Sequence, residues 1–217
     1  MITPTTIVYV TPRSPEASIT PYRSLVRHTA PSSEPVSLSE AKTHARVDTT
    51  DDDTYISSLI AASREYVEDR LDTTLVTTVW ETRYDSFPMF ELVLPRAPML
   101  PSAVTITYRN EGGTDQTITS TNSDFRVDHR IIPGRLTPNY EKTWPAVRGD
   151  ENSVTVQWSA GYGAASSVPA TIKHAMLLLI GHWYEARQPV AVGNSQGAQV
   201  PLTFETLIHS MSHGVYR

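Results

Sequence analysis

The sequence predicts an α+β fold: a helical body of about four helices that carries an inserted small antiparallel β-sheet or sandwich. Apolar residues recur at helical spacing over residues 52–72, and residues 169–187 are apolar on nearly every side, as in a buried helix. Between them the pattern changes to short runs rich in β-branched residues, separated by turn residues, over about residues 75–160. The predicted order is therefore two helices, a β insertion and two helices, within one domain spanning residues 37–217.

An extended arm, residues 1–36, precedes this domain. It contains six prolines: Pro4, Pro12, Pro15, Pro21, Pro31 and Pro35. Proline lacks the backbone N–H that a helix needs, and it favours extended backbone in the residue before it. The only strand-like run in the arm is residues 5–10. We expect the arm to lie on another surface, such as a neighbouring subunit; a loosely ordered terminus is the alternative.

The first two helices are predicted over about residues 37–47 and 52–72. Ser37 and Glu40 have the spacing of a capping box, in which each side chain bonds the backbone of the other residue. The acidic residues 51–53 lie where the positive end of the second helix dipole favours negative charge. The apolar residues of this second helix recur at helical spacing: Ile56, Leu59, Ile60, Val67 and Leu71.

The β insertion has six strand candidates: residues 73–84, 90–94, 104–109, 116–119, 125–127 and 154–158. In the last of them, apolar and polar residues alternate, which is typical of a half-buried strand. The third helix, about residues 169–187, has Pro169 in its first turn and is apolar on nearly every side, which predicts a buried helix. The fourth helix is predicted over about residues 201–212.

The composition excludes several classes of protein. The 217 residues carry a net charge of −5, which argues against a protein that grips nucleic acid by neutralising phosphates. There is no cysteine, so disulfides, thiol catalysis and cysteine-ligated zinc are excluded. The most apolar run, residues 175–180, is far too short to cross a bilayer, and no targeting segment is visible, so we expect a soluble protein.

One five-residue stretch fits the G-x-S-x-G nucleophile-elbow pattern of serine hydrolases: Gly193, Asn194, Ser195, Gln196 and Gly197. An elbow needs a strand before the serine and a helix directly after it. The run before this stretch is too short for a strand, and Pro201 delays the next helix. The partners of Ser195 would have to be Glu205 and either His209 or His213, all near the chain end. A loop between two helices is the better interpretation.

The other motifs that suggest chemistry are also weak. Residues 51–53 lack the glycine and the spacing of a calcium loop. Four histidines could suggest a zinc site, but the sequence has no H-E-x-x-H motif. They are His174, His182, His209 and His213. Gly161 and Gly163 lack the rest of a phosphate-binding motif and predict a turn. We therefore expect no catalytic residue, no metal and no cofactor.

Several short motifs occur in a fixed order over most of the chain. The first part contains PVSLSEAK (35–42), RVD (46–48) and the acidic residues before the long helix. The later part contains LPRAP (94–98), WSAGYG (158–163), HWYEAR (182–187) and Val200-Pro201. This order resembles the tailed-phage head–tail connector (adaptor) family over about residues 36–212. Many relatives have glycine after the long helix where this chain has Asp72, a residue that also tolerates turn conformations.

The resemblance implies a structural virion protein and not an enzyme. Such proteins form a ring, commonly of twelve copies, below the portal of a DNA-filled capsid; the ring extends the DNA channel and docks the next neck or tail component. The implied partners are other copies of the chain, the portal, a downstream neck or tail completion protein and, through the arm, the major capsid protein. Packaged double-stranded DNA would pass through without sequence-specific binding, and no membrane is involved.

The implied location is the virion neck, after assembly in the host cytoplasm. Gene transfer agents use the same family, so a phage and a phage-derived particle both remain open. A serine hydrolase using Ser195 and a stand-alone soluble binding domain are the alternative functions.

Two segments are candidate portal or ring contacts. Tyr216 and Arg217 are residue types favoured at interfaces, although a frayed terminus is an equal alternative. The loop from Gly193 to Gly197 could project into the channel or toward a neighbouring ring.

Overall fold

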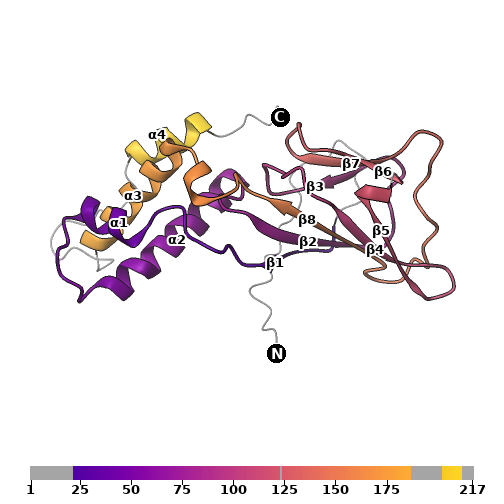
Figure 1. The fold of residues 1–217 in the computed structure, drawn as a ribbon, viewed down its shortest axis with the longest axis horizontal. Helices are drawn as coiled ribbons and strands as arrows, with labels where there is room; N and C mark the ends of the chain where they lie inside the picture. Colours follow the sequence, from indigo (N-terminus) through magenta and orange to yellow (C-terminus); the bar gives the residue numbers. More distant parts are fainter. Residues whose placement is uncertain (1–21, 123, 187–201, 212–217) are drawn as a thin grey trace. The chain divides into compact units, whose positions relative to one another are not determined.

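The structure is a computed structural model that describes residues 22–122, 124–186 and 202–211 (Figure 1). The chain divides into two compact units, which we treat separately. The helical unit comprises residues 32–76 together with the chain from residue 162 onward, and the β unit comprises the chain up to residue 31 together with residues 77–161. The α+β fold class predicted from the sequence is confirmed.

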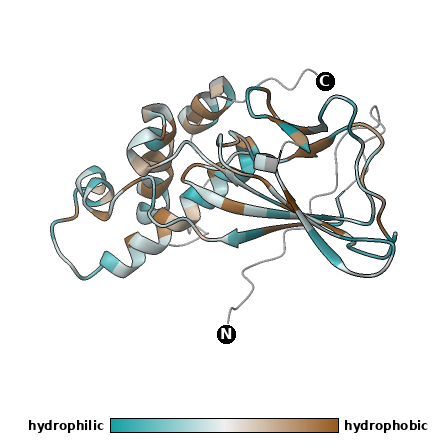
Figure 2. Ribbon diagram, turned by 45° about the vertical axis from the view of Figure 1, so that its right-hand side comes forward, coloured by the Kyte–Doolittle hydropathy of each residue, from teal (hydrophilic) through white to brown (hydrophobic). Residues whose placement is uncertain are grey.

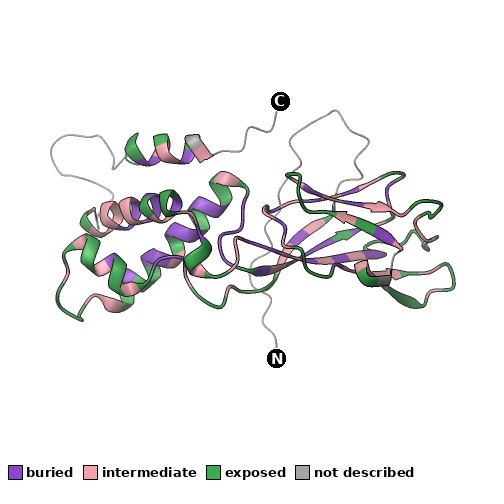
Figure 3. Ribbon diagram, turned by 45° about the horizontal axis from the view of Figure 1, so that its top comes forward, coloured by how far each residue is buried: buried purple, intermediate pink, exposed green. Residues whose placement is uncertain are grey.

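The helical unit contains the four helices that the sequence predicts. They are α1 (Leu38–Ala45), α2 (Asp53–Leu71), α3 (Ala170–Glu185) and α4 (Leu202–Met211), with a short 3₁₀ turn, η2 (Ala165–Ser167), before α3. Each helix contributes to one apolar core, in which Ile56 and Ile60 of α2 lie with Leu179 of α3 and Phe204 of α4. The side of α2 opposite to this core is exposed (Figure 3). The amphipathic spacing read from the sequence therefore corresponds to real burial.

The start of α1 is held by the predicted capping box. The backbone N–H of Glu40 bonds the Ser37 hydroxyl at 3.2 Å, and the Ser37 N–H donates to the Glu40 carboxylate at 2.7 Å. These bonds from Ser37 hold the pKa of Glu40 below its ordinary value. Two backbone donors that the helix itself cannot satisfy are thus paired.

Replacing Ser37 by alanine is expected to lower the free energy of unfolding of the helical unit by about 1 kcal/mol. The substitution removes the hydroxyl that accepts the Glu40 N–H and leaves that donor to water. Urea unfolding followed by circular dichroism measures the change. Ser39→Ala is the matched control, because Ser39 lies exposed on the same helix and its backbone carbonyl, not its hydroxyl, accepts a bond from Thr43. Equal losses for the two variants would contradict a role for the cap.

The acidic residues lie at the start of α2 as predicted, but their side chains bond other helices. Asp52 occupies the N-cap position, but its side chain makes no capping bond. Instead it accepts a hydrogen bond from the Tyr184 hydroxyl at 2.6 Å, while Asp53 pairs with the Lys42 ammonium at 2.5 Å. The carboxylates thus join α2 to α3 and α1, because neighbouring helices offer donors stronger than the backbone of the first turn.

The β unit contains two antiparallel sheets. The larger one has the strand order β1-β2-β8-β4-β5, and the smaller one has the order β3-β7-β6. The strands of the larger sheet are β1 (Ser24–Thr29), β2 (Thr78–Tyr84), β4 (Thr105–Arg109), β5 (Asp115–Thr119) and β8 (Val154–Ala160). Those of the smaller sheet are β3 (Leu92–Leu94), β6 (Phe125–Asp128) and β7 (Gly134–Pro138), and the 3₁₀ turn η1 (Ser120–Asn122) precedes β6.

Strand β8 is the centre of the larger sheet and shows why the alternating pattern forms a strand. Its apolar residues are buried and its polar residues are only partly so, in strict alternation. Figure 2 shows that hydrophobic and hydrophilic residues both occur along the strands of the β unit. Trp158 lies opposite Trp80 of β2, and Val156 opposite Ile106 of β4. Cross-strand apolar pairs of this kind stabilise a sheet. The inner residues of both sheets share one core, which includes Phe125 and Leu136.

Two strands differ from the sequence-based expectation. Residues 24–29, placed in the extended arm, form the edge strand β1, which pairs with β2 and is anchored by the ion pair of Arg23 with Asp85. Strand β7 was not predicted at all. It begins at Gly134 and ends at Pro138, two residue types that normally interrupt strands, and this hides its pattern.

Tyr84, buried at the end of β2, makes the β unit sensitive to alkali. Its hydroxyl donates to the Val93 carbonyl at 3.3 Å, and burial raises its pKa from 10.0 to about 12. The folded state thus favours the neutral phenol. The contribution of buried Tyr84 to the free energy of unfolding is therefore fully present below pH 10 and is lost as the pH rises toward 12. The expected loss is roughly 3 kcal/mol, measured by urea unfolding at several pH values. A Tyr84→Phe variant should lack this dependence, and an unchanged alkaline loss in it would contradict the assignment.

Candidate assembly surface

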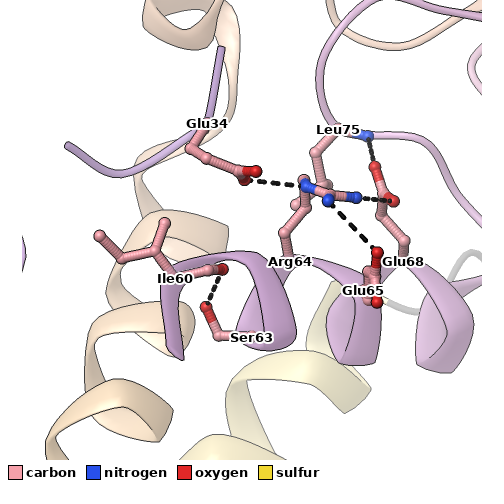
Figure 4. A network of polar contacts seen from close by, with 7 residues as sticks. All are labelled: Glu34, Ile60, Ser63, Arg64, Glu65, Glu68 and Leu75. Atoms are coloured by element: carbon pink, nitrogen blue, oxygen red, sulfur yellow. Dashed lines mark hydrogen bonds and ion pairs between the residues drawn. The ribbon is translucent and has the colours of Figure 1, made fainter. Parts of the chain in front are cut away.

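A buried polar network lies near two of the three places where the chain crosses between the units, the start of the helical unit at residue 32 and its exit after residue 76 (Figure 4). The side chain of Arg64 is only 5% exposed, and its guanidinium bonds the carboxylates of Glu34 at 2.8 Å, Glu68 at 3.0 Å and Glu65 at 3.4 Å. The other oxygen of Glu68 accepts the backbone N–H of Leu75 at 2.9 Å. Burial lowers the pKa of Arg64, but the neighbouring carboxylates, Glu68 above all, more than offset this and leave the pKa above its ordinary value. The network therefore holds Glu34, helix α2 and the backbone at Leu75 together around a permanently charged guanidinium.

Residues of the motifs that carry the family resemblance also form hydrogen bonds and packing contacts that hold the fold. Tyr184 of HWYEAR bonds Asp52, and the ring of Trp183 packs edge-on against Tyr66 at 6.0 Å. In LPRAP, the buried Arg96 lies over the Trp80 ring at 5.1 Å. Gly161 and Gly163 of WSAGYG both have positive φ, which explains glycine at the predicted turn. These residues therefore hold the fold together.

Of the residues proposed for a serine hydrolase, only Glu205 and His209 lie among the described residues. Glu205 forms an ion pair with Arg70 at 3.0 Å, and His209 is exposed. Ser195 and His213 lie outside the described residues, as do the other predicted contact residues: Gly193, Asn194, Gln196, Gly197, Tyr216 and Arg217. Within the described ranges, no group of three or more acidic or histidine side chains is arranged to hold a metal ion. None of the described helices combines the length and apolar character needed to span a membrane.

Large exposed apolar side chains concentrate on the smaller sheet and the loops that flank it. Among the described residues, five of the seven exposed large apolar side chains lie there: Met89, Phe90, Ile131, Ile132 and Tyr140. Met89, Phe90 and Tyr140 are 83%, 70% and 90% exposed. The loop that carries Met89 is supported by Phe87, whose ring stacks on Trp144 at 4.9 Å. Exposed apolar side chains held on a fixed support are typical of a protein interface.

The face of this sheet opposite to the core is polar and rich in arginine. A groove of about 600 Å³ runs over it and is lined by Arg126, Asp128 and Arg130 around β6, by Arg135 of β7 and by Glu91. Arg135 bonds Glu91 at 2.5 Å, whereas the guanidinium groups of Arg126 and Arg130 form no ion pair among the described residues; the backbone N–H of Arg130 donates to the Asp128 carboxylate at 3.0 Å. We call these five lining residues the basic groove. Arginines beside exposed isoleucines match the composition of interface centres.

The sequence does not predict this surface. The relevant strands are only three to five residues long, so alternation over them is too short to tell the inner from the outer face. One signal was present: the apolar pair Ile131-Ile132 directly follows the basic run His129-Arg130 and directly precedes Pro133, a combination typical of an exposed turn and not of a core.

Similar structures are found among the necks of gene transfer agent particles. A chain in the neck of an empty particle, computed with C6 symmetry, has a TM-score of 0.67 at 19% identity and covers 84% of this chain and 94% of its own. A chain in the virion of the native particle has a TM-score of 0.66 at 19% identity, with 86% and 93% covered. A chain in the native neck, computed with C12 symmetry, has a TM-score of 0.57 at 19% identity, with 84% and 93% covered. At this identity the likeness shows a shared fold.

The family is shown by a direct match to the sequence. No protein with curated annotation matches the chain. The model of one family, described as head completion protein, matches residues 34–208, which is most of the chain. This match confirms the connector-type resemblance drawn from the motifs, and the chain belongs to the head completion protein family.

Proposed function

We propose that the chain is a head–tail connector, a structural protein of the particle neck that forms a ring below the portal. The observation that carries this proposal is the family match over residues 34–208, supported by a fold shared with chains of particle necks. The ring would extend the DNA channel and dock the next neck or tail component. Twelve copies is the proposed number, because one similar chain comes from a neck computed with C12 symmetry. The proposal includes no catalysis and no cofactor.

A closed ring places a physical requirement on the chain. Each copy must present two different surfaces, one fitting the other on its neighbour, because the contact in a ring is head-to-tail. Exposed apolar side chains and arginines on the smaller sheet supply one suitable surface. The arm preceding β1 and the loop from Gly193 to Gly197 are proposed as further contacts with the capsid, the portal or a neighbouring ring.

Co-assembly with the portal tests the proposal. Purified chain is mixed with purified portal, and native mass spectrometry counts the copies bound. The expected result is a complex with many copies per portal ring, whether or not the chain forms rings alone. A chain that stays monomeric in the presence of portal contradicts the proposal.

Deleting residues 193–197 is expected to impair tail attachment or DNA retention, whereas Ser195→Ala should leave particle assembly unchanged. The deletion removes a proposed contact loop, and the alanine variant removes only the hydroxyl that a hydrolase would need. Particle counts by electron microscopy and titre measure both. Normal particles from the deletion variant would contradict the role of the loop, and lost titre with Ser195→Ala would favour the enzyme hypothesis.

A further inference from the structure

The two units differ in charge. Among its described residues, the helical unit holds twelve Asp and Glu side chains against five Lys and Arg, whereas the β unit holds ten of each. The net negative charge of the described residues therefore comes from the helical unit. A chain that binds its own copies head-to-tail benefits from such a difference, because oppositely charged surfaces attract and surfaces of the same charge repel.

The positive partner is the basic groove of the β unit. Arg126 and Arg130 are exposed, and the guanidinium of neither forms an ion pair within the described ranges. The exposed Ile131 adjoins them, so charge and apolar area lie together. Arginine can bind carboxylates through two parallel hydrogen bonds, which suits this groove to an acidic protein surface.

The negative partner is a row of carboxylates on the exposed side of α2. Glu65 and Asp69 are exposed and lie four residues apart, on one face of α2, and the exposed Asp72 follows directly after the last helical residue as the C-cap. We call these three residues the acidic row. The small exposed residues Ser58 and Ala62 continue the same face, so another surface can approach the helix closely.

We propose that the basic groove of one copy binds the acidic row of the next copy in the ring. This inference rests on the proposed function, since the ring supplies the neighbouring copy. The groove is less suited to DNA, because Glu91 and Asp128 among its lining residues would repel phosphates and the nearby isoleucine gains nothing from them. A different protein partner is also less favoured, since the chain itself provides an acidic surface with matching charge.

Charge reversal tests the contact. Arg126→Glu with Arg130→Glu, or Asp69→Lys alone, should weaken assembly on the portal by about 10- to 100-fold, as judged by the concentration at half-assembly. Combining the two sets should recover most of that loss. Matched controls are Arg148→Glu, beside the β4–β5 turn, and Asp51→Lys, in the loop before α2; both residues are exposed and both variants should assemble like the natural chain. Circular dichroism confirms folding of each variant.

Cross-linking provides a second measurement that tolerates variants with weakened assembly. The chain has no cysteine, so Arg130→Cys and Asp69→Cys each introduce a single thiol. Rings assembled from a mixture of the two variants should form disulfide-linked dimers under mild oxidation, and rings of either variant alone should not. A link between two different polypeptides cannot come from within one chain.

The outcomes separate this inference from the proposed function. Normal assembly of the reversed variants, with no mixed cross-link, overturns the groove-to-row contact but leaves the ring intact. Unchanged assembly together with weaker DNA binding by the arginine variants also overturns it, and assigns the groove to DNA. Failure of the natural chain to assemble on its portal overturns the proposed function itself.

Discussion

Replacing Glu68 by alanine is expected to lower the free energy of unfolding of the helical unit by about 3–5 kcal/mol. The Glu68 side chain is only 2% exposed and satisfies two buried donors, the Arg64 guanidinium and the Leu75 backbone N–H. Its loss leaves a buried cation with less compensating charge and a buried N–H without its acceptor, and both are costly in a medium of low polarity. Chemical unfolding followed by circular dichroism gives the total loss.

Two variants separate charge from packing at this site. Glu68→Gln keeps an oxygen that can accept the Leu75 N–H but removes the charge, so its loss should be smaller than that of alanine. Replacing Arg64 by Met together with Glu68→Leu removes the two buried charges at once and should recover part of the stability. The carboxylates that lose Arg64, Glu34 and Glu65, are more exposed and can be hydrated, whereas the Leu75 N–H still lacks its acceptor. If the double variant is less stable than Glu68→Ala, the network contributes more than the pairing of its charges.

Replacing Trp158 by alanine is expected to lower the free energy of unfolding of the β unit by about 3–5 kcal/mol. Trp158 is fully buried on the central strand β8, opposite Trp80 and within the core that both sheets share. Alanine leaves a cavity that the surrounding strands cannot fill without disturbing their pairing. Hydrogen exchange read by mass spectrometry should show the loss of protection in the β unit.

Trp158→Phe is the matched control. The indole N–H of Trp158 has no hydrogen-bond partner among the described residues. Phenylalanine therefore loses packing area but no hydrogen bond. We therefore expect a loss clearly smaller than that of alanine. Equal losses for the two variants would mean that the indole N–H is bonded in solution and that the packing argument is incomplete.

Local signals predicted much of the helical unit. The Ser37 and Glu40 pair has only one common use, at the start of a helix, and the spacing of Ile56 and Leu59 leaves only one face to bury. The role of Asp52 could not be predicted in this way. Its partner, Tyr184, is 132 residues distant, and nothing in the local sequence shows that the two side chains meet.

The β unit and the assembly surface were harder to predict from the sequence for a related reason. The outer strand β1 has little alternation of its own and depends on its pairing with β2, while β7 is bounded by Gly134 and Pro138. Whether Ile131 points into a core or into solvent depends on which strands pair, which is a property of the whole fold. The candidate contacts chosen from sequence lie outside the described residues, so they remain predictions.

Averaged electron cryomicroscopy images of the particle neck test the connector assignment most directly. The experiment uses particles that carry this chain with a small tag at its N-terminus. The account predicts a closed ring of this chain, of high cyclic symmetry, between the portal and the first tail component, with the β6–β7 hairpin of each copy against α2 of its neighbour. A neck that lacks this chain, or that holds it as single copies without cyclic contacts, would contradict the account.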